Sequence, residues 1–297
     1  FALGRVPPFL TLRSMNRRRF LRYTRGIAAA GAAGVLGYTF GIEPHWVEVV
    51  QRPLPVVALP ASLVGRRLIQ ISDLHVGPRV DDAYIVHCLQ TVAELKPDIL
   101  LITGDLITYH EPKQLRQLRE ILTHLPKPRL ASLAVLGNHD YGFRWSMPDV
   151  ADDVAGELTR VGVQVLRNES AAVDGLTFAG VDDLWSGAFA PERALSGISP
   201  TQAAIALCHN PDGADKPGWG PFRGWILAGH THGGQCKPPF LPPPILPVRN
   251  RRYVAGEIPL ADGRRLYINR GLGHLLQVRF NVRPEITVFT LRSAGQE

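Results

Sequence analysis

From Arg67 onward the chain alternates between short apolar runs and amphipathic segments, and this alternation limits the possible folds more than any other feature. The apolar runs, typical of buried strands, lie within residues 66–75, 97–106 and 129–140. Segments with apolar side chains at helical spacing lie at 81–96, 111–125 and 148–162. Alternating strands and helices predict an α/β fold that contains parallel sheet.

The second half of the chain is richer in β-type sequence. Five further apolar runs, joined by Gly and Pro, lie at 176–185, 203–211, 224–234, 264–273 and 284–292. Residues 237–252 hold enough prolines to exclude a regular helix or strand. Since no linker-like stretch follows residue 42, we expect one domain over residues 43–297, preceded by an N-terminal extension, residues 1–42.

Polar side chains follow five of the predicted strands. They are Asp73 and His75; Asp105; Asn138 and His139; His209; and His230 and His232. Ligands bind outside the carboxyl ends of the strands in open α/β sheets, so these side chains are expected to converge. A single motif such as "SDLH" is weak evidence because Asp and His often cap turns. "GNHD" and "GHTHGG" are stronger, because polar groups beside a buried strand are costly without partners.

With His139 set aside, the set comprises two carboxylates, one amide oxygen and four imidazoles, without a thiolate. This is too many ligands for one tetrahedral ion, and it suits two ions that share a bridging carboxylate. Two-metal sites hold their ions roughly 3.5–4 Å apart and stabilise the attacking and leaving oxygens of an in-line displacement. The sequence therefore predicts two divalent ions, with Mn, Zn and Fe as candidates.

The motifs "SDLHVG", "GDL", "LGNHD", "CHNP" and "GHTHGG", in this order, resemble those of the calcineurin-like metallophosphoesterase family. The resemblance extends from Leu68 to Leu291 and implies a four-layer α/β/β/α sandwich that carries two metal ions. The basic leader and the segments "GVDDLWSG" and "RRYVAG" further resemble exported bacterial phosphodiesterases of this family.

Carried over motif by motif, the resemblance implies a role for each residue. The first ion would be held by Asp73, His75 and His232, and the second by Asn138, His209 and His230. Asp105 would bridge the two ions. His139 would act on the phosphoryl or leaving group, and Asp140 would orient the His139 ring. The family often has Asp or Asn three residues after the bridging carboxylate; Thr108 stands there instead, which puts a supporting contact in doubt.

Four further residues are considered individually. Arg270 follows a predicted strand and is predicted to bind the substrate phosphate, with an ion pair as the alternative. Trp185 is expected in the core rather than on a substrate face. Cys208 points away from the side of the strand that carries His209, and Cys88 falls on a helix, so both are expected to pack in the core.

The net charge of the chain resides in its N-terminal extension. The chain has 33 Lys and Arg against 26 Asp and Glu, a net charge of +7, and residues 1–42 contain seven Arg and no Lys, Asp or Glu. Residues 43–297 are therefore neutral overall. A neutral domain makes nucleic acid an unexpected partner.

The order of residues in the extension is typical of an export signal. Arg17–Arg25 is a basic cluster, and the uncharged, Ala- and Gly-rich residues 26–42 follow it. The pair Arg17-Arg18 favours a twin-arginine signal and hence the twin-arginine export machinery as partner. We expect a periplasmic protein, or one at the outer face of the cytoplasmic membrane if the signal is retained. A basic arm before a buried helix is the alternative.

The expected activity is phosphoester hydrolysis by in-line attack of a metal-bound hydroxide, with a phosphodiester as substrate. The first alternative is a lipid-linked pyrophosphate, as in related hydrolases of UDP-2,3-diacylglucosamine. The apolar and basic residues 237–252 would then contact a membrane surface, with a rigid proline-rich surface loop as the alternative. The second alternative is a metal-binding scaffold without turnover, against which the complete ligand set and His139 argue.

Overall fold

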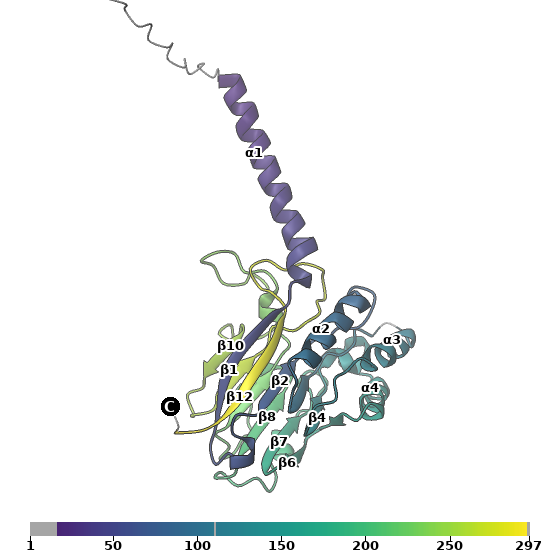
Figure 1. The fold of residues 1–297 in the computed structure, drawn as a ribbon, viewed down its shortest axis with the longest axis vertical. Coiled ribbons are helices and arrows are strands. Elements are labelled where there is room, and N and C mark those ends of the chain that lie inside the picture. The colour runs from purple at the N-terminus through teal and green to yellow at the C-terminus, as the bar shows by residue number, and fades with distance from the viewer. Residues whose placement is uncertain (1–16, 110, 296–297) are drawn as a thin grey trace, which may run out of the picture.

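The structure is a computed structural model that describes residues 17–109 and 111–295. Helix α1 (Arg17–Gly37) projects from one end of the body, and the short helices η1 (Tyr38–Ile42) and η2 (Glu43–His45) connect it to the rest (Figure 1). No residue of α1 is buried. In the described part of the chain, every helix is too short or too polar to cross a membrane.

The body contains two six-stranded sheets. The first has the order β1-β12-β2-β3-β4-β5 and the second the order β10-β11-β9-β8-β7-β6. The strands of the first are β1 (Glu48–Val56), β2 (Arg67–Ile71), β3 (Ile99–Thr103), β4 (Ala131–Val135), β5 (Gln164–Val165) and β12 (Glu285–Ser293). Those of the second are β6 (Glu169–Val173), β7 (Leu176–Val181), β8 (Ala204–Cys208), β9 (Trp225–Ala228), β10 (Gly256–Pro259) and β11 (Arg265–Ile268).

The predicted parallel strands are confirmed in the first sheet, and the second sheet also contains parallel strands. Strands β2 to β5 pair in parallel, as do β7, β8, β9 and β11, while β12 runs antiparallel to β2. Parallel strands end at the same edge of a sheet. The residues that follow β2, β3 and β4 are therefore brought together, and so are those that follow β8 and β9.

Apolar side chains divide the body into layers. Helices α2 (Asp82–Glu94), α3 (Lys113–Leu122) and α4 (Pro148–Arg160) pack on the first sheet, where buried Ile85, Leu118 and Ile102 belong to one apolar cluster. A second core, with Leu101 and Phe178, lies between the sheets. The outer face of the second sheet is covered by short elements, α5 (Pro191–Ala194) and η6 (Pro211–Asp215). The four-layer α/β/β/α sandwich is confirmed, with a thin fourth layer.

The smaller sequence predictions can also be compared with the structure. Cys88 and Cys208 are buried, and residues 237–252 form no helix or strand, as predicted. The domain boundary at residue 42 stays a prediction. The carbonyls of Thr39 and Phe40, just before it, already accept hydrogen bonds from the segment that precedes β12.

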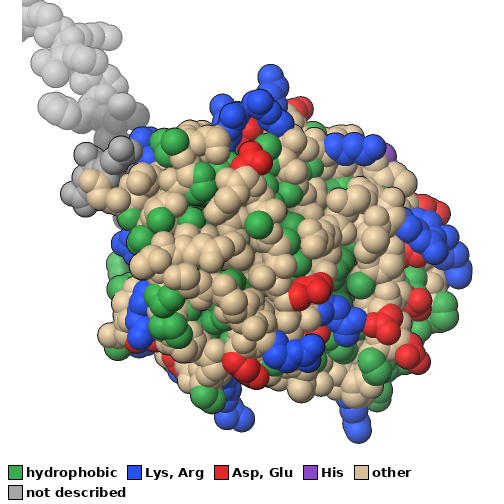
Figure 2. Space-filling view, turned by 90° about the horizontal axis from the view of Figure 1, so that it is seen from below, with side chains coloured by type: hydrophobic (Ala, Val, Ile, Leu, Met, Phe, Trp, Pro, Cys, Tyr) green, Lys and Arg blue, Asp and Glu red, His purple; other side chains and the backbone are tan. Residues whose placement is uncertain are grey.

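The end of the molecule opposite α1 shows how charge is distributed (Figure 2). Lys and Arg side chains alternate there with Asp and Glu, and no broad basic surface covers this face (Figure 2). This mixture agrees with the neutral composition of residues 43–297.

Candidate metal centre

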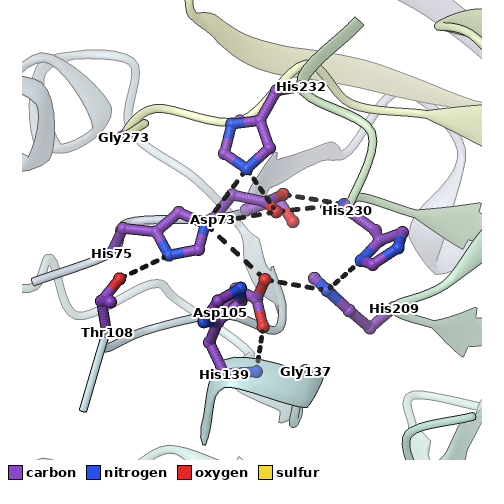
Figure 3. A network of polar contacts seen from close by, with 12 residues as sticks. Asp73, His75, Asp105, Thr108, Gly137, His139, His209, His230, His232 and Gly273 are labelled. Carbon is purple, nitrogen blue, oxygen red and sulfur yellow. Dashed lines mark hydrogen bonds and ion pairs between the residues drawn. The ribbon is translucent and has the colours of Figure 1, made fainter. Parts of the chain in front are cut away.

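The predicted ligands converge at the carboxyl ends of strands from both sheets (Figure 3). They follow strands β2, β3 and β4 of the first sheet (Asp73, His75, Asp105, Asn138) and strands β8 and β9 of the second (His209, His230, His232). Five have φ between 50° and 73°: Asp73, His75, Asp105, His230 and His232. This left-handed region costs a residue other than glycine about 1–3 kcal/mol, and such strain concentrates at functional sites. The surrounding packing thus holds these residues against their local backbone preference.

Asp73, His75 and His232 form the first cluster (Figure 3). The Nε2 atom of His232 lies 3.0 Å from Nε2 of His75 and 3.3 Å from Oδ1 of Asp73. One ligand atom from each residue lies within 4.8 Å of the other two, and all three residues are buried. A single ion can contact all three, as the sequence predicts for the first ion.

Asp105, His209 and His230 form the second cluster. His209 Nε2 lies 3.2 Å from Asp105 Oδ2 and 3.2 Å from His230 Nδ1. The same Asp105 Oδ2 lies 3.6 Å from Nε2 of His75 in the first cluster. One carboxylate oxygen therefore faces both clusters, which is the position expected of a bridging ligand.

The side chain of Asn138 gives separate evidence that the residues of the site fit metal ions. Asn138 begins η4 (Asn138–Tyr141) and is fully buried, and neither its Oδ1 nor its Nδ2 has a hydrogen-bond partner among the described residues. An unsatisfied buried polar group costs about 1–3 kcal/mol. Coordination of an ion by Oδ1 would remove this cost at the oxygen, so the residues present fit a two-ion centre.

The charges of the site point in the same direction. Burial lowers the pKa of His75 and of His232 well below the usual value, which leaves neutral imidazoles with free lone pairs. Burial also opposes protonation of His209, but the Asp105 carboxylate outweighs it and raises the pKa of His209 to about 10. Burial raises the pKa of Asp73 to about 7. Buried carboxylates thus hold positive charge in the site, here as a proton on His209, and a bound cation would supply that charge instead.

Hydrogen bonds behind the ligands fix the orientation of three rings. His209 Nδ1 donates to the Thr103 carbonyl at 2.7 Å, and His230 Nε2 donates to the Pro247 carbonyl at 3.0 Å. His75 Nδ1 lies 2.9 Å from Thr108 Oγ1, so the supporting contact left in doubt by the sequence is supplied by a hydroxyl. Such contacts set the tautomer and leave the opposite ring nitrogen for a metal.

His139 lies at the edge of the centre. It is half-buried, and its ring packs edge-on against that of His75 with centroids 5.0 Å apart. Its backbone N–H donates to Asp105 Oδ1 at 2.9 Å. His139 is thus held beside the first cluster and Asp105, and the residue stays partly exposed.

The predicted role of Asp140 is wrong. Among the described residues, its carboxylate bonds to backbone rather than to the His139 ring. It accepts N–H groups from Asp105, Leu106 and Ile107 after β3 and from Gly137 after β4, at 2.8–3.2 Å. Asp140 therefore holds two ligand-bearing loops together.

Arg270 forms ion pairs, which the sequence offered as the alternative to phosphate binding. Its guanidinium pairs with Glu285 and, at 2.9 Å, with Glu48, joining the end of β11 to β12 and β1. Both partners are carboxylates of the scaffold. Phosphate binding by Arg270 stays a prediction.

Two kinds of residue at the site were missed by sequence reasoning. The first is glycine that makes room for a ligand: a Cβ on Gly137 would lie 2.2 Å from Asp105 Oδ1, and one on Gly104 would lie 2.6 Å from His209 Nδ1. The signal was present, since each glycine directly precedes a ligand. The second is Trp185, which is half-buried against His230 instead of lying in the core.

Comparison with known proteins agrees with this geometry. The sequence profile of the calcineurin-like phosphoesterases matches residues 66–234. The chain is 35% identical over 293 residues to the uncharacterized metallophosphoesterase YkuE of Bacillus subtilis (strain 168), covering 96% of this chain and 100% of that protein. It is 30% identical over 282 residues to the phosphodiesterase YaeI of Escherichia coli (strain K12), with 93% and 99% covered.

A third relative is named for a different activity, that of a pyrophosphatase. The UDP-2,3-diacylglucosamine pyrophosphatase LpxG of Chlamydia trachomatis is 28% identical over 320 residues, covering 89% of this chain and 95% of that protein. The fold, the two clusters and these matches identify the class: the chain belongs to the calcineurin-like metallophosphoesterase family. Among its relatives, YkuE and YaeI match it over nearly their whole length.

Proposed function

We propose that this chain is a phosphodiesterase that hydrolyses a P–O bond at a centre of two divalent ions. The observation that carries the proposal is the position of Asp105, whose Oδ2 faces His209 at 3.2 Å and His75 at 3.6 Å. The likeness to YaeI favours a diester over a monoester. Mn, Zn and Fe all suit a ligand set of imidazoles, carboxylates and an amide.

Bound divalent ions supply an activated water and positive charge beside the phosphoryl oxygens. The residues of the chain place and shape this chemistry. The backbone N–H of His139 donates to Asp105 Oδ1, and we propose that the ring of this half-buried residue donates a proton to the leaving oxygen. Asp140 keeps the loops that carry Asp105 and Asn138 in register.

The test uses the full-length protein, stripped of metal and reloaded with Mn²⁺ or Zn²⁺. Bis-p-nitrophenyl phosphate is compared with p-nitrophenyl phosphate. We expect metal-dependent diester cleavage that is lost in Asp105→Asn and weakened in His139→Ala. Asp174→Asn, in the exposed turn between β6 and β7, and His124→Ala, exposed after α3, are matched controls. Preference for the monoester would make the protein a phosphatase.

A lipid-linked pyrophosphate is the second candidate substrate, because exposed apolar side chains gather near the centre. Phe240, Leu241 and Ile245 of the proline-rich loop are exposed, and so is Leu276. The loop is joined to the metal centre, because the Pro247 carbonyl accepts from His230. The likeness to LpxG supports this candidate. Turnover of a UDP-linked lipid without turnover of simple diesters would establish it, whereas two bound metals without turnover of either would indicate a scaffold.

A membrane surface is a proposed partner of this end of the molecule. Gln235 donates to the Leu276 carbonyl, and Gln277 donates to the Phe40 carbonyl beside α1, so the loop tips and the base of α1 are neighbours. Anionic vesicles should co-sediment with the protein, and less so after Phe240→Ser and Leu241→Ser. Equal sedimentation of both proteins would contradict this contact.

Export by the twin-arginine route is proposed for the leader. Its support is the order of the sequence, in which Arg17 and Arg18 precede an uncharged stretch, and the exposure of the whole of α1. Replacement of both arginines by lysine should retain the protein in the cytoplasm. Unchanged fractionation into the periplasm or the membrane would contradict the route.

A further inference from the structure

Two tryptophans from different sheets meet beside the metal centre. Trp145 ends η5 (Phe143–Trp145), which follows the loop after β4 that carries Asn138. Trp185 follows β7 of the second sheet. Their ring centroids are 4.5 Å apart with a tilt of 37°. Trp185 in turn packs edge-to-face on His230, with centroids again 4.5 Å apart. The indoles therefore form a wall that continues directly from a predicted metal ligand.

Each indole is held in place by its own loop. The N–H groups of Trp185 and Ser186 both donate to Asp183 Oδ2 at 2.7 Å, and Asp183 is buried. On the other side, Arg144 and Trp145 have φ of 53° and 61°. Bulky residues rarely adopt the left-handed region, and strain of this kind marks ligand clamps and active sites. The wall is thus a constructed feature of the fold.

The two indoles are more exposed than the tryptophans of the core, and Trp145 packs against the edge of the first apolar cluster. Trp219 and Trp225 are only 4% exposed, and their ring N–H groups donate to the carbonyls of Gly213 and Pro55. Trp145 and Trp185 are half-buried, and within the described residues neither ring N–H makes a hydrogen bond. Phe143, two residues before Trp145, is 69% exposed. Accessible aromatic surface thus borders the centre.

We propose that Trp145 and Trp185 form a subsite that stacks a planar aromatic group of the substrate, such as a nucleobase, while the phosphate lies at the metal centre. This proposal rests on the proposed phosphodiesterase function and names the class of ester. The wall touches His230 of the second cluster, whereas His139 touches His75 of the first. The two features therefore flank the centre at different clusters.

Stacking of a base on an aromatic side chain is worth about 5- to 150-fold in affinity. The test measures binding by titration calorimetry on the full-length, Mn²⁺-loaded protein. Its probes are uridine 5′-monophosphate and ribose 5-phosphate, which differ only in the base. The nucleotide should bind at least about fivefold more tightly. In Trp145→Leu and Trp185→Leu this preference should disappear, while the affinity for ribose 5-phosphate stays constant.

Matched variants separate stacking from general damage. Trp185→Phe should keep most of the preference, and Trp46→Leu, at an exposed tryptophan away from these rings, should keep all of it. Metal content is measured for each variant. If Trp185→Leu loses metal through its contact with His230, Trp145→Leu decides, since it packs on Trp185 and not on that ligand.

Equal affinity of the wild type for both probes, or an unchanged preference in Trp145→Leu, would overturn the proposal. The measurement requires no turnover. The subsite can therefore fail while diester hydrolysis stands, and hydrolysis can fail while the subsite stands.

Discussion

Asp140 lies behind Asp105: Asp140 Oδ2 accepts the backbone N–H of Asp105 at 2.9 Å, and the N–H of His139 returns to Asp105 Oδ1 at 2.9 Å. Asp140 thus fixes the backbone of Asp105, the predicted bridging ligand. Asp105 in turn fixes the backbone of His139, the predicted proton donor. The loops after β3 and β4 consequently behave as one unit.

Asp140→Ala should therefore damage the metal centre and the fold together. The change leaves four buried N–H groups without their acceptor, at about 1–3 kcal/mol for each one that stays unsatisfied. We expect a loss of several kcal/mol in the free energy of unfolding, measured by urea denaturation, and loss of bound metal. Asp174→Asn is the control. A free energy of unfolding that changes by less than about 1 kcal/mol, the contribution of roughly one hydrogen bond, would contradict this role.

Gly137→Ala tests the close approach of backbone and ligand. Gly137 has φ of −106°, so alanine suits the backbone, but its Cβ would lie 2.2 Å from Asp105 Oδ1. Metal-dependent activity should fall by at least about a hundredfold, the scale reported for small displacements of reacting groups.

Gly156→Ala in α4 is the matched control, because nothing lies within 4 Å of the added Cβ. It should stabilise the protein by about 0.5–1 kcal/mol, as alanine does in helices. Equal metal content and activity in the two variants would show that residue 137 tolerates a side chain.

Arg279 is a buried cation in the scaffold, and Arg279→Met should destabilise the protein. Its guanidinium donates to four carbonyls, those of Arg270, Gly271, Gly273 and Val282, at 2.8–3.2 Å. Burial lowers its pKa to about 10, so it stays charged at neutral pH. Orphaned carbonyls cost about 1–3 kcal/mol each. Thermal unfolding should occur at clearly lower temperature than in Arg223→Met, whose exposed guanidinium also donates to carbonyls.

The parallel order of β2, β3 and β4 could be predicted from the sequence, but β1 could not. Pro53 and Pro55 interrupt its ladder pattern, and the structure accommodates them because β1 is an edge strand, paired in parallel with β12 more than two hundred residues away. Local sequence contains no signal for such a distant partner.

At the site, sequence reasoning identified the residues that converge but not what stands behind them. The ligand motifs lie at strand ends, and parallel pairing brings together the ligands of each sheet. The packing of one sheet on the other then joins the two groups. The backbone N–H groups that bond to Asp140, and the contact of Thr108 with His75, depend on how neighbouring loops lie against each other. The spacing of residues in the sequence does not reveal this arrangement. The position of Trp185 depends likewise on a contact between the two sheets.

Stability at mildly acidic pH should depend on His274. Burial lowers its pKa to about 4 and outweighs the hydrogen bond that Nε2 donates to the Arg79 carbonyl, which raises it. Nδ1 is buried without a partner in the described chain. A group whose pKa is lower in the folded state stabilises the fold above its unfolded pKa of about 6.5 and loses that contribution as the pH falls towards 4. A shift of this size corresponds to at most about 3 kcal/mol.

His274→Gln should flatten the stability profile between pH 6.5 and 4, measured by urea denaturation at each pH, relative to exposed His124→Gln. A slope in His274→Gln as steep as in the wild type would assign the acid sensitivity to other groups.

Removal of metal should lower the stability of the protein. The number of ions that bind can be tested with a variant of Asn138. A ligand at a hundred times its Kd stabilises the folded state by about 2.7 kcal/mol. Chelated protein should therefore unfold at lower temperature than protein reloaded with Zn²⁺. Asn138→Ala removes a predicted ligand of the second ion alone and should reduce the bound metal from two ions to one, measured by elemental analysis. Two ions retained in Asn138→Ala, with the wild-type gain in unfolding temperature, would exclude Asn138 as a ligand and leave its unbonded buried amide without a function.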